Sequence, residues 1–280
     1  MSKRWRLIIE NKNDGYYNMA VDEALLFSYS VHKIPTLRIY GWDKPFISLG
    51  YNQDPVKVLN PLIKIPVVRR ITGGSVIVHD KEITYSIVCG PGDLELTGPV
   101  KESYRQLCSF LKIFYLKLGL TAEFAQDVPG RQEKIFPASD FCFMDRQQFD
   151  LMIGAKKIGG NAQRRRRDSV FQHGSIPQRV DFSLLSSLMM CGQSINSKTC
   201  GLDDLLKQGT DFCKLQVMLA ESFSEAFSIK LSQEKMPSKE EKLSSMFLRR
   251  KYTSCDWNYK RIFKPAGKVI DDLSKVLKAF

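Results

Sequence analysis

A long apolar run, paired cysteines and a cluster of histidines are all missing from this 280-residue sequence. No stretch of about 18 consecutive apolar residues occurs, so we expect no transmembrane helix. Residues 1–14 have a basic start but no apolar stretch long enough for a signal peptide. We therefore expect a cytoplasmic protein that makes no contact with a membrane.

The cysteines and histidines argue against disulfides and against metal. An odd number of cysteines without a signal peptide favours free thiols, and none of the seven belongs to a CxxC pair. His32, His79 and His173 stand singly, so we predict no metal site. Most of the cysteines should be buried apolar residues, and one could be a nucleophile. They are Cys89, Cys108, Cys142, Cys191, Cys200, Cys213 and Cys255.

Acidic residues are few relative to basic ones. The chain has 30 Asp and Glu against 42 Lys and Arg, a formal net charge of +12. Such a surface attracts acidic partners and raises their association rate. Nucleic acid is one partner of this kind, and an acidic protein domain is another. Composition alone leaves both open.

Strand-like segments outnumber helical ones and do not alternate regularly with them. This pattern favours an α+β domain, a mixed sheet with packed helices, over a doubly wound fold. A chain of this length can bury one large core. We expect one domain over residues 1–264 and a short tail over 265–280.

Periodicity places the individual elements. Two hairpins are predicted, one pairing 36–40 with 46–51 and one pairing 75–79 with 83–88. Other strands are expected at 5–10, 149–153, 156–163 and 169–176, and helices at 18–30, 101–118, 211–227 and from 238 towards 252. Cys108 lies on the apolar stripe of the second helix and Cys213 beside that of the third, so both are expected to be core residues.

Residues 69–80, RRITGGSVIVHD, are the first candidate site. Two arginines, a small-residue turn and an alternating strand can place backbone N–H groups and cationic heads around an anion or a carbonyl. A glycine hairpin turn with surface arginines is the structural alternative.

Two further strings carry glycines on neighbouring strands. Residues 156–163 read KKIGGNAQ and residues 172–176 read QHGSI. Glycines at the same level of two strands let a ligand approach the backbone closely. A lysine held desolvated beside them, Lys157, would suit general-base work, although a surface lysine is the simpler interpretation.

Cys142 and the run Arg164–Arg167 are the remaining candidates. Cys142 lies in a loop-like segment and on no helical stripe, so a role as core filler is less expected than for Cys108. The four arginines are expected at a solvated hairpin tip, where they could also bind phosphates or carboxylates of a partner.

These strings, in this order and spacing, resemble the lipoate-protein ligase and octanoyltransferase superfamily, which shares its catalytic domain with biotin ligases. The resemblance extends from Trp5 to about Lys264. The segments that carry it are 18–24, 38–42, 48–53, 69–80, 156–163 and 251–258. It implies the biotinyl/lipoyl-attachment fold, a mixed sheet with helices on its outer face.

Within the superfamily the chain is most similar to the Gram-positive type of octanoyltransferase and to its relative that takes octanoyl from the glycine-cleavage H protein. Those enzymes have a cysteine fifteen residues before the lysine of KxxGxAQ, as Cys142 precedes Lys157 here. The resemblance implies that Cys142 is the acyl-accepting nucleophile and that Lys157 tunes its pKa. The implied substrate-binding residues are Arg70, Gly73, Gly74, His79, Gly160, Asn161 and Ala162.

The implied reaction moves an octanoyl group from an acyl carrier protein, or from a lipoyl-domain donor, to a lysine of a lipoyl domain. The acceptor would be the glycine-cleavage H protein or a 2-oxoacid dehydrogenase subunit, and no cofactor would be needed. The alternative is an ATP-dependent lipoate-protein ligase, which uses ATP and Mg²⁺ and commonly has a C-terminal accessory domain, for which we expect no room after Asn258. A nucleic-acid-binding module is disfavoured because no aromatics interleave with Arg164–Arg167.

Two departures from the family pattern stand out. The family usually has GGG or GGR where this chain has Gly73-Gly74-Ser75, which changes the expected contact to the acyl carbonyl or to an adenylate. Thr199-Cys200-Gly201 resembles the PCG motif that carries the nucleophile in the other octanoyltransferase class. Cys200 is therefore the second candidate nucleophile, after Cys142.

Overall fold

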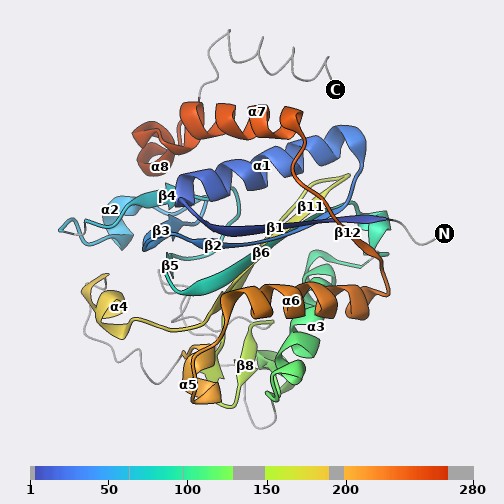
Figure 1. Ribbon diagram of the computed structural model, residues 1–280. Coiled ribbons are helices and arrows are strands. Elements are labelled where there is room, and N and C mark those ends of the chain that lie inside the picture. Colours follow the sequence, from blue (N-terminus) through green and yellow to red (C-terminus); the bar gives the residue numbers. More distant parts are fainter. Residues whose placement is uncertain (1–3, 63, 97, 129–148, 189–198, 264–280) are drawn as a thin grey trace.

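The structure, a computed structural model, describes residues 4–62, 64–96, 98–128, 149–188 and 199–263. Its centre is a six-stranded sheet in the order β10-β11-β6-β2-β1-β12 (Figure 1). Strand β1 runs parallel to both its neighbours, and the other adjacent pairs are antiparallel. The predicted mixed sheet of an α+β domain is confirmed. Its strands are β1 (Trp5–Asn13), β2 (Thr36–Trp42), β6 (Glu82–Cys89), β10 (Gly160–Arg165), β11 (Val170–Pro177) and β12 (Leu231–Gln233).

The large sheet separates two hydrophobic cores. In β2, Leu37 and Ile39 belong to one core, and Tyr40 and Trp42 belong to the other. Alternate residues of a strand point to opposite faces, so both faces of the sheet are covered. Strand β6 is buried at all eight of its positions, because strands pair with both its edges and cores pack on both its faces.

Helices lie on both faces of this sheet. Helices α1 and α7 cover one face, and α3 and α6 cover the other (Figure 1). The expectation of helices on one outer face is corrected by this arrangement. The apolar stripe predicted over 101–118 is confirmed in α3, and α6 begins after Asp211, whose carboxylate accepts a hydrogen bond from the backbone N–H of Lys214. The bounds are α1 (Gly15–His32), α3 (Val100–Lys117), α6 (Phe212–Phe227) and α7 (Ser238–Phe247).

A second, three-stranded sheet has the order β4-β3-β5 and shows that both predicted hairpins are wrong. Residues 36–40 and 83–88 lie in the large sheet, whereas their supposed partners lie in β3 (Phe46–Leu49) and β5 (Ile77–His79). Strand β4 spans Val67–Arg69. The chain changes sheet at each of the two turns. Polar and apolar residues alternate in β2 and β6, as in Thr36-Leu37-Arg38-Ile39 and Glu82-Ile83-Thr84-Tyr85. Strands β2, β3 and β6 are nevertheless buried at every residue, so this alternation marks no solvent-facing side and does not show which strand pairs with which.

A third small sheet, in the order β7-β8-β9, leads directly into the large one. Its strands are β7 (Glu123–Phe124), β8 (Leu151–Ile153) and β9 (Lys156–Lys157). Gly159 follows with a φ of +151°, and a Cβ there would lie 2.4 Å from the carbonyl oxygen of Ser175. Only glycine fits this bend. It lets β9 and β10 belong to different sheets and places Lys157 at their junction.

The C-terminal helices are tied to the domain by buried ion pairs. Arg6 on β1 and Glu240 on α7 form a bidentate pair at 2.8 and 2.9 Å, and each side chain is 4% exposed. Lys251 in the following π-helical turn (Leu248–Tyr252) pairs with Glu23 of α1 at 2.7 Å. Breaking one partner of such a pair leaves an uncompensated buried charge, which is strongly destabilising. These contacts fix the last helices on α1.

The remaining elements are short. They are α2 (Pro55–Val58), the 3₁₀ turns Pro91–Asp93 and Ala125–Asp127, α4 (Phe182–Leu188), α5 (Leu202–Leu206) and α8 (Cys255–Lys260). The tail predicted over 265–280 lies outside the described residues, and the domain boundary stays a prediction. No helix in the described part of the chain has the length and apolar character that a membrane crossing requires.

Candidate active site

A cleft of ≈ 490 Å³ is lined by residues from all three sheets and from the start of α3. This volume is typical of a small-molecule site. The glycine turn after β4 forms one wall, and β9 and β10 contribute another. The side chains of Val100 and Lys101, both exposed, lie on its rim. The lining residues include Arg70, Gly73, Gly74, Ser75, Tyr104, Phe149, Asp150, Lys157, Asn161 and Ala162.

Lys157 lies in the cleft wall and is almost fully buried. Its Nζ contacts Asp150 Oδ2 at 2.7 Å, and the two side chains are 1% and 4% exposed. The structure therefore buries Lys157 beside the glycines, as the sequence predicted, and adds the Asp150 carboxylate as its partner. Asp150 was not recognised from the sequence, although the hairpin register provides a signal. Met152 lies opposite Lys157, and Asp150, two residues before Met152, is on the same face, at the diagonal position.

Arg70 fixes the glycine turn from inside. Its guanidinium donates hydrogen bonds to the backbone carbonyls of Ser48, Gly73 and Ser75 at 3.0, 2.9 and 2.7 Å. Gly74 has a φ of +91°, a conformation that glycine adopts without strain. Arg70 thus lines the cleft as predicted, but its N–H groups hold the backbone. Neither Arg70 nor the equally buried Arg69 is a surface arginine.

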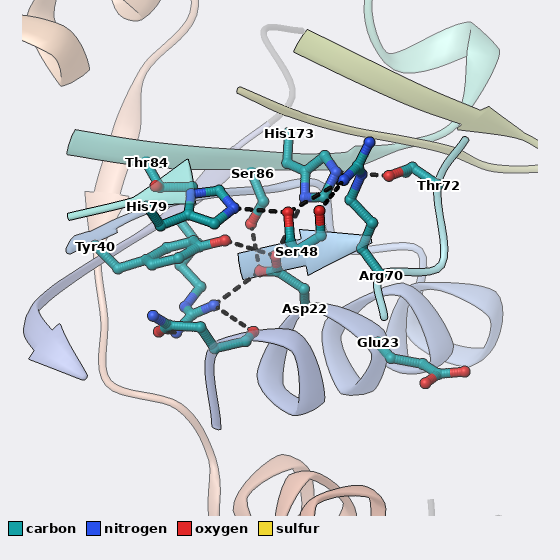
Figure 2. Close-up of polar contacts among 12 residues, drawn as sticks. Asp22, Glu23, Tyr40, Ser48, Arg70, Thr72, His79, Thr84, Ser86 and His173 are labelled. Carbon is teal, nitrogen blue, oxygen red and sulfur yellow. Dashed lines mark hydrogen bonds and ion pairs between the residues drawn. The ribbon is translucent and has the colours of Figure 1, made fainter. Parts of the chain in front are cut away.

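A buried chain of polar groups lies below Arg70 (Figure 2). Ser48 Oγ lies 3.1 Å from Arg70 and 2.7 Å from His79 Nε2. The other ring nitrogen of His79 contacts Glu82 Oε1 at 2.8 Å, and Glu82 also accepts a hydrogen bond from Ser175. The ring of His79 stacks on Trp42 with centroids 3.8 Å apart. His79 is therefore connected by hydrogen bonds, through Ser48, to Arg70, which lines the cleft.

A second buried cluster is centred on Asp22 and supports the same turn (Figure 2). The Asp22 carboxylate accepts hydrogen bonds from Arg38, Tyr40 and Ser86 at 2.8, 2.8 and 2.7 Å. His173 lies beside it and contacts Thr72 Oγ1 at 2.7 Å, just before the glycines. Burial lowers the pKa of His173, against the opposing effect of Asp22. A neutral imidazole thus positions Thr72.

The structure brings most of the sequence-predicted site residues together. Arg70, Gly73, Gly74, Lys157, Asn161 and Ala162 line the cleft. His79 and Gly160 line a small pocket of ≈ 10 Å³ that shares Arg70, Ile77 and Ala162 with it. Cys142 lies outside the described residues, and its role as nucleophile stays a prediction.

The other cysteines have clear environments. Cys108 is buried in the core, as predicted, but Cys213 is exposed, so the prediction of a core role for it is wrong. Cys213 is next to the apolar stripe of α6 and points away from it. Cys200 is 1% exposed and packs in the core, and burial raises the pKa of its thiol to about 11. It does not line the cleft, and a protonated thiol is a weak nucleophile.

The arginine run divides into two halves. Arg164 donates to the carbonyl of Ile71, and Arg165 donates to the carbonyls of Leu96 and Gly98. Arg166 and Arg167 are exposed at the tip between β10 and β11. The predicted solvated hairpin tip is confirmed for the second half only. Within the described residues, no group of three or more His, Cys, Asp or Glu side chains is arranged to hold a metal ion.

Comparison with known proteins identifies the family. Residues 14–224 match the family model described as "Lipoyl protein ligase A/B catalytic domain". The chain belongs to this family. It is also 34% identical to octanoyltransferase LipM of Kyrpidia tusciae, over 92% of this chain and 99% of the relative. The corresponding enzyme of Bacillus subtilis is 30% identical over 92% of this chain and 98% of its own length.

A solved structure shows the same fold. The putative lipoate protein ligase of T. acidophilum with bound lipoic acid superimposes with a TM-score of 0.76, at 23% identity, over 92% of this chain and 99% of that one. The predicted lipoyl-attachment fold is confirmed. The curated relatives that match over nearly the whole chain are transferases, so the predicted acyltransferase is confirmed and the ATP-dependent ligase is not favoured.

The thiol environments predict which cysteines react with iodoacetamide. At pH 8 a thiol with a pKa of about 11 is only about one part in a thousand thiolate. Peptide mapping after brief alkylation should find the label on the exposed Cys213 and Cys255. Cys89, Cys108 and Cys200 should be labelled only after unfolding, and rapid labelling of the Cys200 peptide in the folded protein would contradict the buried environment described here.

Proposed function

We propose that the protein transfers an octanoyl group from an acyl carrier protein to the lysine of a lipoyl domain, through a thioester on Cys142. The observation that carries the proposal is the buried Lys157 in the wall of a cleft of suitable volume, in a chain whose relatives are octanoyltransferases. A cytoplasmic location stays a prediction.

The assignment of Cys142 is supported by its spacing and by covalent reach. It precedes Lys157 by fifteen residues and Phe149 by seven, and Phe149 lines the cleft. Seven residues span at most about 25 Å, which allows the thiol to reach this wall. A cation within about 4–6 Å can lower a thiol pKa by one to three units. Lys157 is the cation we assign to that task.

The glycine turn supplies donors for the oxyanion. The backbone N–H groups of Gly73 and Gly74 donate no hydrogen bond to any described residue, and both glycines line the cleft. Arg70 holds their carbonyl side from behind, so the turn does not have to reorganise during the reaction. Fixed donors that point at a developing negative charge are usually the largest single contribution to catalysis.

The reaction then has two balanced steps. The Cys142 thiolate attacks the thioester carbonyl of the carrier, the new C–S bond forms, and the thiolate of the carrier leaves and takes up a proton. The neutral amine of the lipoyl-domain lysine next attacks the acyl-enzyme. An amide bond forms, the C–S bond to Cys142 breaks, and the proton lost by the amine neutralises the departing thiolate.

The partners we assign are acidic, and the tip between β10 and β11 carries exposed positive charge. Burial lowers the pKa of Lys251 against the opposing effect of Glu23, and Arg164 and Arg166 lower it further. The hairpin tip therefore lies next to the π-helical turn that contains Arg249 and Arg250, both exposed. A concentration of positive charge of this kind steers acidic partners towards the site. We place the docking of the protein substrates on this surface.

The energy source tests the proposed function. A thioester is already activated, so octanoyl carrier protein and a lipoyl domain should give octanoylated product without ATP, and Cys142→Ala should abolish it. Mass spectrometry of the lipoyl domain measures the product. If product forms from free octanoate or lipoate only when ATP and Mg²⁺ are added, the transferase assignment is wrong.

The two exposed arginines test the docking surface. Arg166→Gln with Arg167→Gln should raise KM for the protein substrates several-fold at low salt and leave kcat almost unchanged. The difference should shrink as salt rises, because charges about 10 Å apart are screened at 0.1 M. Lys207→Gln with Lys214→Gln, two exposed lysines on the α5–α6 segment, is the matched control. Equal effects of both double variants, or rates that do not depend on ionic strength, would exclude this surface.

A further inference from the structure

The ion pair between Lys157 and Asp150 places two opposite charges in the wall of the cleft. The two atoms are 2.7 Å apart, and neither side chain is more than 4% exposed. Moving an isolated ammonium group out of water is costly, and a buried lysine without a counter-charge tends to lose its proton. The carboxylate offsets that cost. Asp150 therefore supplies a counter-charge to Lys157 in this cleft.

The backbone of Lys157 is held independently of that contact. Its carbonyl oxygen accepts hydrogen bonds from Thr199 Oγ1 at 3.0 Å and from the backbone N–H of Cys200 at 3.3 Å. The next carbonyl, that of Ile158, accepts from Tyr115 at 3.0 Å. These contacts fix where the strand lies. The pairing with Asp150 then determines the direction and the charge of the side chain.

The other charged side chains among the described residues that line the cleft are cationic. Arg70 and Lys101 line it, and Lys101 is exposed on its rim. Asp150 is the one carboxylate among the described residues that line the cleft. The thiol of Cys108 is close enough to Asp150 for the carboxylate to raise its pKa, in addition to the effect of burial. No other acidic group among these lining residues can take the place of Asp150.

We propose that Asp150 is a positioning residue for acyl transfer, which keeps the Lys157 ammonium protonated and held in the cleft wall, so that its charge favours the thiolate. This inference rests on the proposed function and extends it. It gives Lys157 one task, to stabilise the thiolate by its charge. A lysine that is already protonated cannot accept a proton from the incoming amine, so the role of proton acceptor that the sequence suggested for Lys157 is replaced.

The sign of one pH shift tests the proposal. The acidic limb of the pH dependence of kcat/KM reports formation of the thiolate in the free enzyme. With Asp150→Asn, Lys157 should lose its proton and the thiolate should lose its cation. The limb should move to higher pH by about one unit or more, and activity at pH 7 should fall about tenfold and recover in alkali.

The opposite shift would overturn the proposal. If Lys157 stays protonated without Asp150, the loss of one negative charge makes the thiolate easier to form, and the limb moves to lower pH. An unmoved limb with uniformly lower activity would show a structural role only. Asp150→Glu keeps the carboxylate and should restore the wild-type limb. Asp127→Asn removes a partner of Arg105, in a pair at 2.8 Å that does not line the cleft, and should leave the limb in place.

A double variant makes the test independent of the acyl-transfer assay. Lys157→Met removes the cation beside a buried carboxylate, and adding Asp150→Asn removes the charge of that carboxylate. Thermal unfolding should therefore give a higher Tm for the double variant than for Lys157→Met alone, and Asp150→Asn should no longer raise the limb in that background. If the double variant is no more stable, the two side chains are not coupled. Failure of the proposed function would instead be seen in the wild type, as the absence of octanoyl transfer without ATP.

Discussion

The fold depends on the need to satisfy polar groups that are buried where its sheets meet. Arg70, Glu82 and Asp22 are all at most 3% exposed, and water cannot solvate them there. Each is surrounded by donors or acceptors from a different strand or turn. Unpaired, any of them would cost several kcal/mol, roughly, relative to its hydrated state. Paired, they fix the relative positions of the large sheet, the small sheet and the glycine turn.

The cleft is a consequence of that arrangement. Two networks, one through His79 and one through His173, end on the residues that flank Gly73 and Gly74. The turn is therefore held from behind, and both glycines line the cleft. The pair Lys157–Asp150 lines the same cleft, in a chain segment bent by Gly159. Backbone donors and a positive charge are the two features that stabilise an oxyanion and a thiolate.

Much of this could be predicted from the sequence, and the failures have physical reasons. The helix over 101–118 was found because its apolar residues repeat with helical periodicity, and the cleft residues were found because three strings share glycines with charged neighbours. The two hairpins were wrong because alternation along a strand that is buried on both faces does not show which strand is its partner. Asp150 was missed because its role depends on hairpin register. The sequence left open whether Arg69 and Arg70 are surface arginines, because sequence alone does not show which carbonyls will surround an arginine. Cys213 was correctly placed beside the apolar stripe of its helix, but a residue beside the stripe can face solvent, as Cys213 does.

The central claim is that a cysteine paired functionally with Lys157 carries the acyl group. The most direct measurement is tryptic mapping of the protein after it is mixed with octanoyl carrier protein and quenched in acid, with no lipoyl domain present. The account predicts a gain in mass of one octanoyl group on the peptide that contains Cys142, reversed by hydroxylamine at neutral pH. An octanoyl group on the peptide of the buried Cys200, or on no cysteine at all, would contradict it.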